Sequence, residues 1–192
     1  MYKGLSIIIV LLGIFTITPS LLHAQEESFE SIDEAFESLN PLVPPPTRSP
    51  RSTLRSFLTS TEQAINTIKN IYDEGQAEGG LSYTEEQLSR AADAQELIER
   101  AVRSLNLSDV PDAHRERIGL NRTLMLRESF NRIETPDIES APGLYTQGKD
   151  GERTINTDLP KRWEIPGTEI AIELGKEGKY VREYLFSIDT VT

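Results

Sequence analysis

The sequence predicts an α+β domain in which three or so packed helices precede a C-terminal antiparallel β-hairpin. Between residues 50 and 133 the apolar residues recur at intervals of three and four, the period of a helix that buries one face. Behind Pro136 the period changes to two, and glycines separate two short runs. Helices followed by strands, rather than alternating with them, are typical of the α+β class.

The first helix is expected to begin at Ser49-Pro50, because serine is a good N-cap and proline suits the first helical position. Gly75 is expected to end it. Its apolar residues have helical spacing and should face the core along the whole helix: Leu54, Phe57, Leu58, Ile65, Ile68 and Tyr72.

Two further helices are expected before residue 134. In the second, Ser82 and Glu85 have the spacing of a capping box, and the apolar face that begins at Leu88 should pack against the first helix. The third covers residues 112–133 and contains Gly119, which leaves open whether it is one helix or two.

The strands are expected within residues 154–192, after a loop over residues 134–153. Residues 168–174 and the run from Tyr180 to Ile188 alternate in polarity, and the segment Gly175-Lys176-Glu177-Gly178 is the expected turn. Because an isolated hairpin is only marginally stable, it should pack on the helices, with Trp163 or its tyrosines at the contact.

Residues 1–24 have the pattern of an export signal. Lys3 supplies a positive charge, Leu5 to Leu22 is almost wholly apolar, and Ala24 ends a plausible cleavage site. We therefore expect a periplasmic protein. The alternative is an uncleaved anchor, which would tether the domain to the inner membrane through residues 5–22; the remainder lies outside the cytosol in both cases.

Residues 25–49 connect this signal to the domain expected at residues 50–192. The first part is acidic and carries one apolar stripe at spacings of three and four, and a proline-rich linker follows it. The stripe is a candidate interaction surface for a partner or for the domain itself, and the alternative is a half-ordered tail. Its residues are Phe29, Ile32, Phe36 and Leu39.

Charge and composition exclude several classes of function. The chain has 20 basic and 31 acidic residues, a net charge of −11, and no cysteine. Such acidity opposes binding to nucleic acid or to anionic lipid through long-range attraction. The absence of cysteine excludes disulfides and thiolate metal sites. We expect neither a metal nor another cofactor.

No catalytic motif is present in the sequence. There is no H-E-x-x-H, no glycine-rich phosphate loop and no G-x-S-x-G, and His114 lies in a polar stretch where we expect it to be solvated. We therefore expect a protein that is not an enzyme. The arginines at the start of the first helix are candidates for contact with an acidic partner or a lipid phosphate, with a solvated helix start as the alternative: Arg48, Arg51 and Arg55.

Four stretches carry a resemblance to a known family. They read SPRSTLRSFL at 49–58, LNLSDVP at 105–111, LPKRWEIPGTEI at 159–170 and YLFS at 184–187. Together they resemble the extracytoplasmic N-terminal region of some bacterial mechanosensitive channels of the small-conductance type. The resemblance covers residues 49–192, and the run R-W-E-I-P-G-T-E-I with the later Y-L-F-S is its most specific part.

The resemblance implies a periplasmic region that precedes several membrane helices, a pore helix rich in small residues and a cytoplasmic vestibule. No second run of about 18 apolar residues follows the signal, so we expect that this chain cannot conduct ions by itself. We therefore expect an accessory or interaction domain whose partners are channel helices or its own copies, and which meets the membrane only through such a channel or an uncleaved signal. The alternative is a stand-alone periplasmic module that binds a small molecule or peptide.

Overall fold

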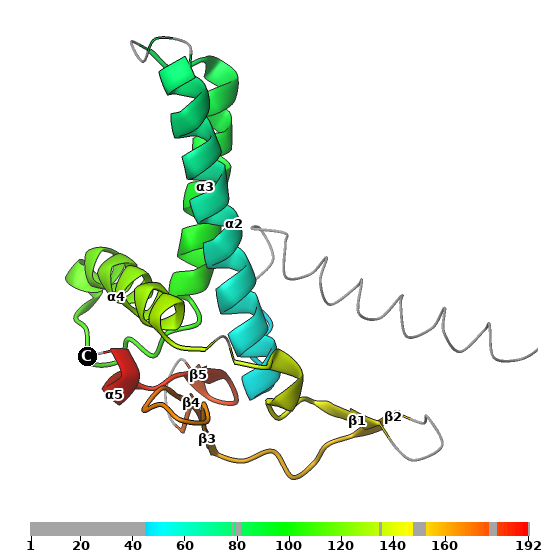
Figure 1. Cartoon of the computed structure of the whole chain (residues 1–192). Coiled ribbons are helices and arrows are strands. Elements are labelled where there is room, and N and C mark those ends of the chain that lie inside the picture. The colour runs from blue at the N-terminus through cyan, green and yellow to red at the C-terminus, as the bar shows by residue number, and fades with distance from the viewer. Residues whose placement is uncertain are drawn as a thin grey trace, which may run out of the picture. The chain divides into compact units, whose positions relative to one another are not determined.

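Three long helices and a set of short strands make up the part of the chain that the structure describes. The computed structural model describes residues 45–77, 79, 82–134, 136–147, 153–176 and 180–191. The helices come first and the strands follow, with a short 3₁₀ helix η1 (Ile138–Ser140) between them and a short helix α5 (Ile188–Val191) after them (Figure 1). This order confirms the predicted α+β class. None of the described helices is long and apolar enough to span a bilayer.

Helix α2 (Pro50–Ala77) begins where the sequence predicts. The hydroxyl of Ser49 accepts a hydrogen bond from the backbone N–H of Ser52 at 3.2 Å, which satisfies one of the free donors of the first turn. The helix continues two residues beyond Gly75, so the expectation that this glycine ends it is wrong. A Cβ at Gly75 would lie 3.1 Å from the ring of Tyr83, so glycine lets the start of the next segment pass close to α2.

Helix α3 (Glu85–Val102) has a capping box two residues later than predicted. The Thr84 hydroxyl accepts from the N–H of Gln87 at 3.2 Å, and the Gln87 side-chain oxygen accepts from the N–H of Thr84 at 2.8 Å. The sequence offers two overlapping patterns in one run, S-x-x-E and T-x-x-Q, and only the second places both partners at the helix start.

Helix α4 (Asp112–Arg132) is a single helix, which settles the question raised by Gly119. This glycine lies where α4 crosses the end of α3, and a Cβ there would be 2.6 Å from Cγ1 of Val102. Gly119 therefore permits the close approach of two helices and does not interrupt α4.

The strands form two antiparallel sheets. Strands β3 (Arg162–Glu164), β4 (Ala171–Leu174) and β5 (Tyr184–Phe186) lie in the order β3-β4-β5, and Trp163, Ile172 and Phe186 are in register across them. The predicted hairpin is the β4–β5 pair, but β5 begins four residues later than expected and β3 adds a third strand.

The second sheet lies in a segment predicted to be mostly loop. Strand β1 (Tyr145–Gln147) pairs with β2 (Arg153–Ile155), and Tyr145 is opposite Ile155. The two strands are three residues each, too short for the alternation in polarity to stand out in the sequence. The prediction of an unstructured loop over residues 134–153 is therefore wrong at this hairpin.

An aromatic cluster joins the helices to the three-stranded sheet. The ring of Phe57 on α2 lies 4.9 Å from that of Phe186 on β5 and 5.9 Å from that of Phe130 on α4. All three residues are buried in the main core. The segment after α3 extends this contact, because the N–H of Phe186 donates to the carbonyl of Ser104 at 2.9 Å. The hairpin thus packs on the helices, as the sequence predicts.

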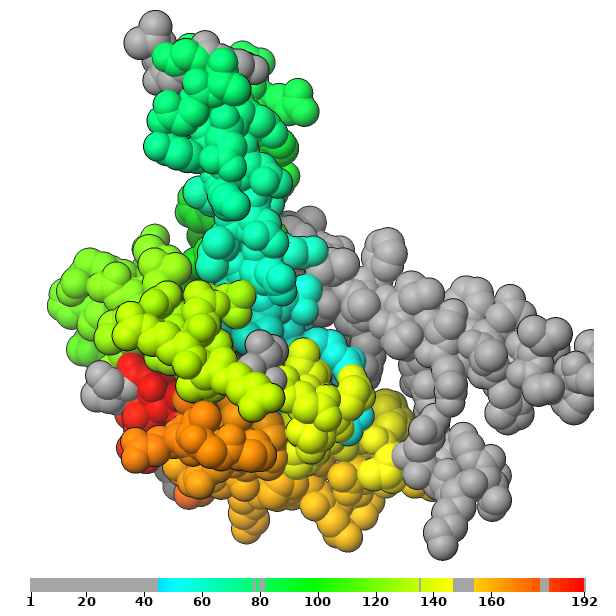
Figure 2. All heavy atoms as spheres, in the orientation of Figure 1, coloured from blue at the N-terminus to red at the C-terminus, as the bar shows by residue number. Residues whose placement is uncertain are grey.

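Beyond this core the α2/α3 pair continues as a two-helix arm, which we define as residues 62–77 of α2 and residues 85–99 of α3 (Figures 1 and 2). Its seam is a separate small cluster of Ala64, Ala94 and Leu97, with Ile98 packed against it. The main core includes α2 residues only as far as Leu58 and α3 residues from Ala101. The described helices and strands outside the arm therefore leave much of its surface uncovered.

Candidate interaction surfaces

The arm carries an exposed apolar face. Ile65, Ile68 and Tyr72 follow one another on α2 at intervals of three and four, and they are 41%, 49% and 55% exposed. Leu88 on α3 is 57% exposed. The sequence predicts that Ile65, Ile68 and Tyr72 face the core and that Leu88 packs against α2. These predictions are wrong, because the four side chains are exposed and no described element outside the arm covers them. We refer to these four residues as the arm face.

Helix geometry places the four residues on one side of the arm. Each residue of an α-helix is rotated by about 100° around the helix axis from its predecessor. Tyr72 is therefore rotated by roughly 80° from the seam residue Ala64, and Leu88 is rotated in the same sense by roughly 120° from the seam residue Ala94. Because α2 and α3 are antiparallel, rotations of the same sense from the seam bring the two residues to the same side of the arm. The apolar side chains therefore form one surface that extends across both helices.

The opposite side of the arm is polar. Glu74 and Arg90 form an ion pair between the two helices, in which Arg90 Nη1 is 3.1 Å from Glu74 Oε1. Hydrogen bonding to Arg90 lowers the pKa of the Glu74 carboxyl. An arm with one polar and one apolar side resembles an amphipathic helix with a free apolar face, which in soluble proteins marks an interaction surface.

Helix α4 lies at the base of the arm, on the side of the arm face. Gly119 packs against Val102, which is displaced from the seam in the same sense as Tyr72 and Leu88. Leu120 and Leu124, one turn apart on α4, are 41% and 45% exposed. They lie on the flank of α4 opposite Arg122, whose guanidinium pairs with Asp109 in the segment that follows α3.

The arm and α4 have opposite charge. The arm contains eight acidic and two basic residues, a net charge of −6, whereas α4 contains three acidic residues and five arginines, a net charge of +2. Arg117 and Arg127 lie one turn before Leu120 and one turn after Leu124. Glu116 and Glu128 also lie one turn from these leucines, so the complementarity between the arm and α4 is one of net charge.

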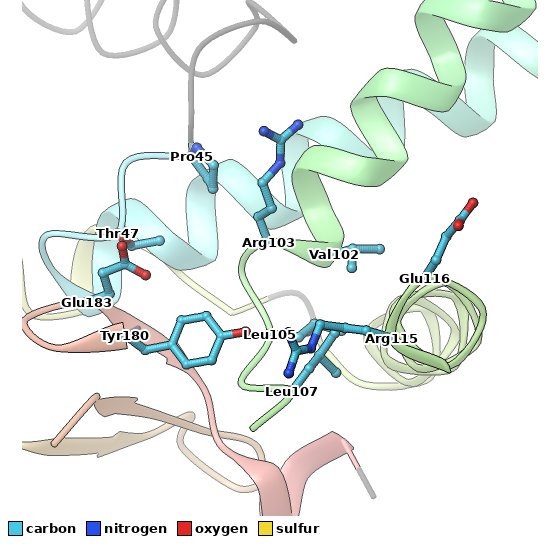
Figure 3. Close-up of a pocket in the computed structure, with 10 residues that line it drawn as sticks. All are labelled: Pro45, Thr47, Val102, Arg103, Leu105, Leu107, Arg115, Glu116, Tyr180 and Glu183. Atoms are coloured by element: carbon cyan, nitrogen blue, oxygen red, sulfur yellow. The ribbon is translucent and has the colours of Figure 1, made fainter. Parts of the chain in front are cut away.

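A pocket of about 240 Å³ lies where the end of α3 meets the start of α4 (Figure 3). Its lining includes the buried side chains of Leu105 and Leu107, and Figure 3 shows the side chains of Tyr180 and Arg115 extending toward each other across it. Arg115 donates to the carbonyl of Val110 at 3.2 Å, and its buried Nε has no hydrogen-bond partner among the described residues. The pocket combines an apolar floor with an arginine. Its volume is below the range of 300–1,000 Å³ that is usual for drug-sized ligands.

The arginines proposed from the sequence have a carboxylate within the domain. Glu139 on η1 forms ion pairs with Arg51, at 3.3 Å, and with Arg55, at 2.5 Å. Arg51 also donates to the carbonyl of Ala141 at 2.9 Å, so the two arginines join α2 to the η1 segment. Arg48 is exposed. The charges of Arg51 and Arg55 therefore lie against an exposed carboxylate of the same domain.

The other residues proposed from the sequence lie apart from the arm face. Trp163 is half-buried on β3 and packs against the main core. His114 is exposed on α4. Among the residues that the structure describes, no group of three or more histidines, aspartates and glutamates is arranged to hold a metal ion. The acidic stripe lies outside the described residues: Phe29, Ile32, Phe36 and Leu39.

Comparison of the chain with protein-family models, with curated proteins and with solved structures found no match. The fold defines an α+β domain with a two-helix arm.

Proposed function

We propose that this chain is a non-enzymatic interaction domain of the periplasm. It acts as the accessory region of a small-conductance mechanosensitive channel, whose N-terminal region its sequence resembles, or as a stand-alone relative of that region. The observation that carries the proposal is the arm face, where four large apolar side chains remain about half exposed on one side of two packed helices. Burial of such residues is the main driving force of most protein association.

The arm is suited to transmit a contact to the rest of the domain. Its two helices are continuous with the segments that enter the main core, through Phe57 on α2 and Ala101 on α3. A partner bound to the arm is therefore connected to the core without an intervening flexible loop. A domain shifts a closed-to-open equilibrium only if it binds the two states of its partner with different affinity.

Electrophysiology tests this proposal. The mature chain, added to the periplasmic face of membrane patches that contain a small-conductance channel from the same organism, is expected to change the tension at which the channel opens. A variant with Ile68→Glu and Tyr72→Glu is expected to lose this effect, because two carboxylates then replace apolar groups on the arm face. Ile155→Glu, which alters an apolar residue that is 66% exposed on β2, is the matched control and is expected to retain it. An opening tension that is the same with and without the chain would contradict the proposal.

The pocket favours a second candidate function, the binding of a small apolar carboxylate. The apolar floor of Leu105 and Leu107 suits an alkyl chain. The guanidinium of Arg115 already pairs with Asp112 and donates to Val110, and its Nε–H is the donor left for the charged end. Titration with hexanoate, followed by NMR, is expected to shift the resonances of these residues and of Tyr180, whereas hexanol shifts them less. Arg115→Gln is expected to remove the difference between the two probes. If neither probe shifts these resonances at millimolar concentration, this candidate fails.

A further inference from the structure

We propose that the arm face binds a second copy of this chain, with the arm of each copy packed against α4 of the other. This inference rests on the proposed function and names a partner for the same surface. It commits to contact between the arm face and the exposed leucines of α4. The surfaces that meet are Ile65, Ile68, Tyr72 and Leu88 on one copy and the partner's Leu120 and Leu124.

Charge complementarity selects α4 as the partner surface. The arm has a net charge of −6, so a second arm packed directly against it would bring two acidic surfaces together. The same repulsion disfavours the segment over residues 25–40, which contains six acidic residues and no basic one. Helix α4, with five arginines and a net charge of +2, has the opposite sign to the arm and an apolar stripe of its own.

The placement of the two surfaces suits a symmetric pair. Within one copy, α4 crosses the base of the arm at Gly119 and Val102, on the side of the arm face. Two copies related by a two-fold axis can therefore place each arm along the partner's α4, so that both contacts form at once and no surface is left for a third copy. Such an isologous interface is closed and gives a dimer.

Sedimentation velocity of the mature chain over a range of concentrations is the first test. We expect a reversible monomer–dimer equilibrium that weakens as the salt concentration rises, because the arm and α4 have net charges of opposite sign. Ile68→Glu and Leu120→Glu are each expected to raise the dissociation constant at least tenfold, and Ile155→Glu is expected to leave it unchanged. A chain that stays monomeric at millimolar concentration would overturn the proposal.

The absence of cysteine from the chain allows a sharper test of which surfaces meet. Two single variants, Ile68→Cys and Leu120→Cys, are oxidised separately and as a mixture, and the products are separated on a non-reducing gel. We expect a disulfide-linked heterodimer in the mixture in large excess over the homodimer of either variant alone. A mixture in which Ile68→Cys pairs mainly with itself would show arm-to-arm contact and would overturn the assignment of α4. Ile155→Cys mixed with either variant is the control and is expected to give little product.

The two proposals fail in different ways. If the chain is monomeric but still shifts the opening tension of a channel, the second copy is the wrong partner and the interaction function stands. If the chain dimerises through these surfaces and leaves channel opening unchanged, the self-association stands and the accessory role fails.

Discussion

Replacing Phe57 tests whether one aromatic cluster joins the helices to the sheet. Phe57 is fully buried on α2, and its ring contacts those of Phe130 on α4 and Phe186 on β5. The change Phe57→Ala removes the ring that touches both of the other elements. We therefore expect a large loss of stability in the whole domain rather than local fraying of α2.

The magnitude follows from burial and from the ring contacts. A fully buried phenylalanine replaced by alanine costs about 3–5 kcal/mol in the free energy of unfolding, which includes the cavity that remains. Two ring pairs, at 4.9 and 5.9 Å between centroids, each contribute about 0.5–1.5 kcal/mol beyond area burial, which places Phe57 in the upper part of that range. We expect a loss of about 4–5 kcal/mol. Domains of this size have a total stability of about 5–15 kcal/mol, so the variant is expected to be folded but marginal.

Urea unfolding, followed by circular dichroism and by the fluorescence of the single tryptophan, Trp163, measures this loss. Phe57→Leu keeps most of the volume and is expected to cost about 1–2 kcal/mol. Ile68→Ala, on the exposed arm face, is expected to change the stability of the monomer by no more than about 0.5 kcal/mol. The reasoning is refuted if Phe57→Ala costs less than about 2 kcal/mol, or if Ile68→Ala costs as much as Phe57→Leu.

Three other predictions follow from single contacts. Thr84→Ala is expected to lower the free energy of unfolding by about 1 kcal/mol and to speed amide exchange in the first turn of α3, because Thr84 is the cap. Ser82→Ala is expected to change the stability and the exchange rates by no more than the experimental error. Hydrogen bonds from Arg122 lower the pKa of the Asp109 carboxyl in the folded state. The stability from this pair is therefore full above the ordinary pKa of about 3.9 and is lost as the pH falls through the lower folded value. Asp109→Asn is expected to cost about 1 kcal/mol at pH 7 and to flatten the loss of stability below about pH 4 in acid unfolding curves; parallel curves for the two proteins would contradict this. Gly175→Ala is expected to cost about 2–3 kcal/mol in urea unfolding, because its Cβ would lie 2.0 Å from a backbone carbonyl of the β4–β5 connection, and an unchanged midpoint would contradict it.

The sequence predicted an element well where the residues that define it are close neighbours along the chain. The N-cap at Ser49, the stripe that includes Phe57, and the alternation around Ile172 depend on neighbours within a few residues. The fold class followed from their order along the chain. Two errors have the same cause. Both candidate caps of α3 fit the spacing of a capping box, and the short β1–β2 hairpin shows almost no alternation in polarity.

Features that depend on distant partners were not predictable from one sequence. Arg51 and Arg55 were recognised as a cluster, but Glu139, which pairs with both, lies more than 80 residues away. The pocket gathers residues from the entry to α2, the segment after α3, helix α4 and the β4–β5 connection. No spacing in the sequence records such an assembly, because each contributing residue is an ordinary surface or core residue in its own segment.

The arm face shows what hydrophobic periodicity does and does not determine. In α2 the same 3.6-residue period continues from Leu54 through Tyr72, so the period alone predicts one buried face along the whole helix. The period gives the direction of that face, whereas burial also requires an element to cover it, and the main core reaches α2 only as far as Leu58. Beyond that point Ala64 and Ile71 are still buried in the α2/α3 seam, whereas Ile65, Ile68 and Tyr72 are about half exposed. We propose that a second copy covers these residues, and the salt dependence of self-association tests whether the covering element is an oppositely charged helix.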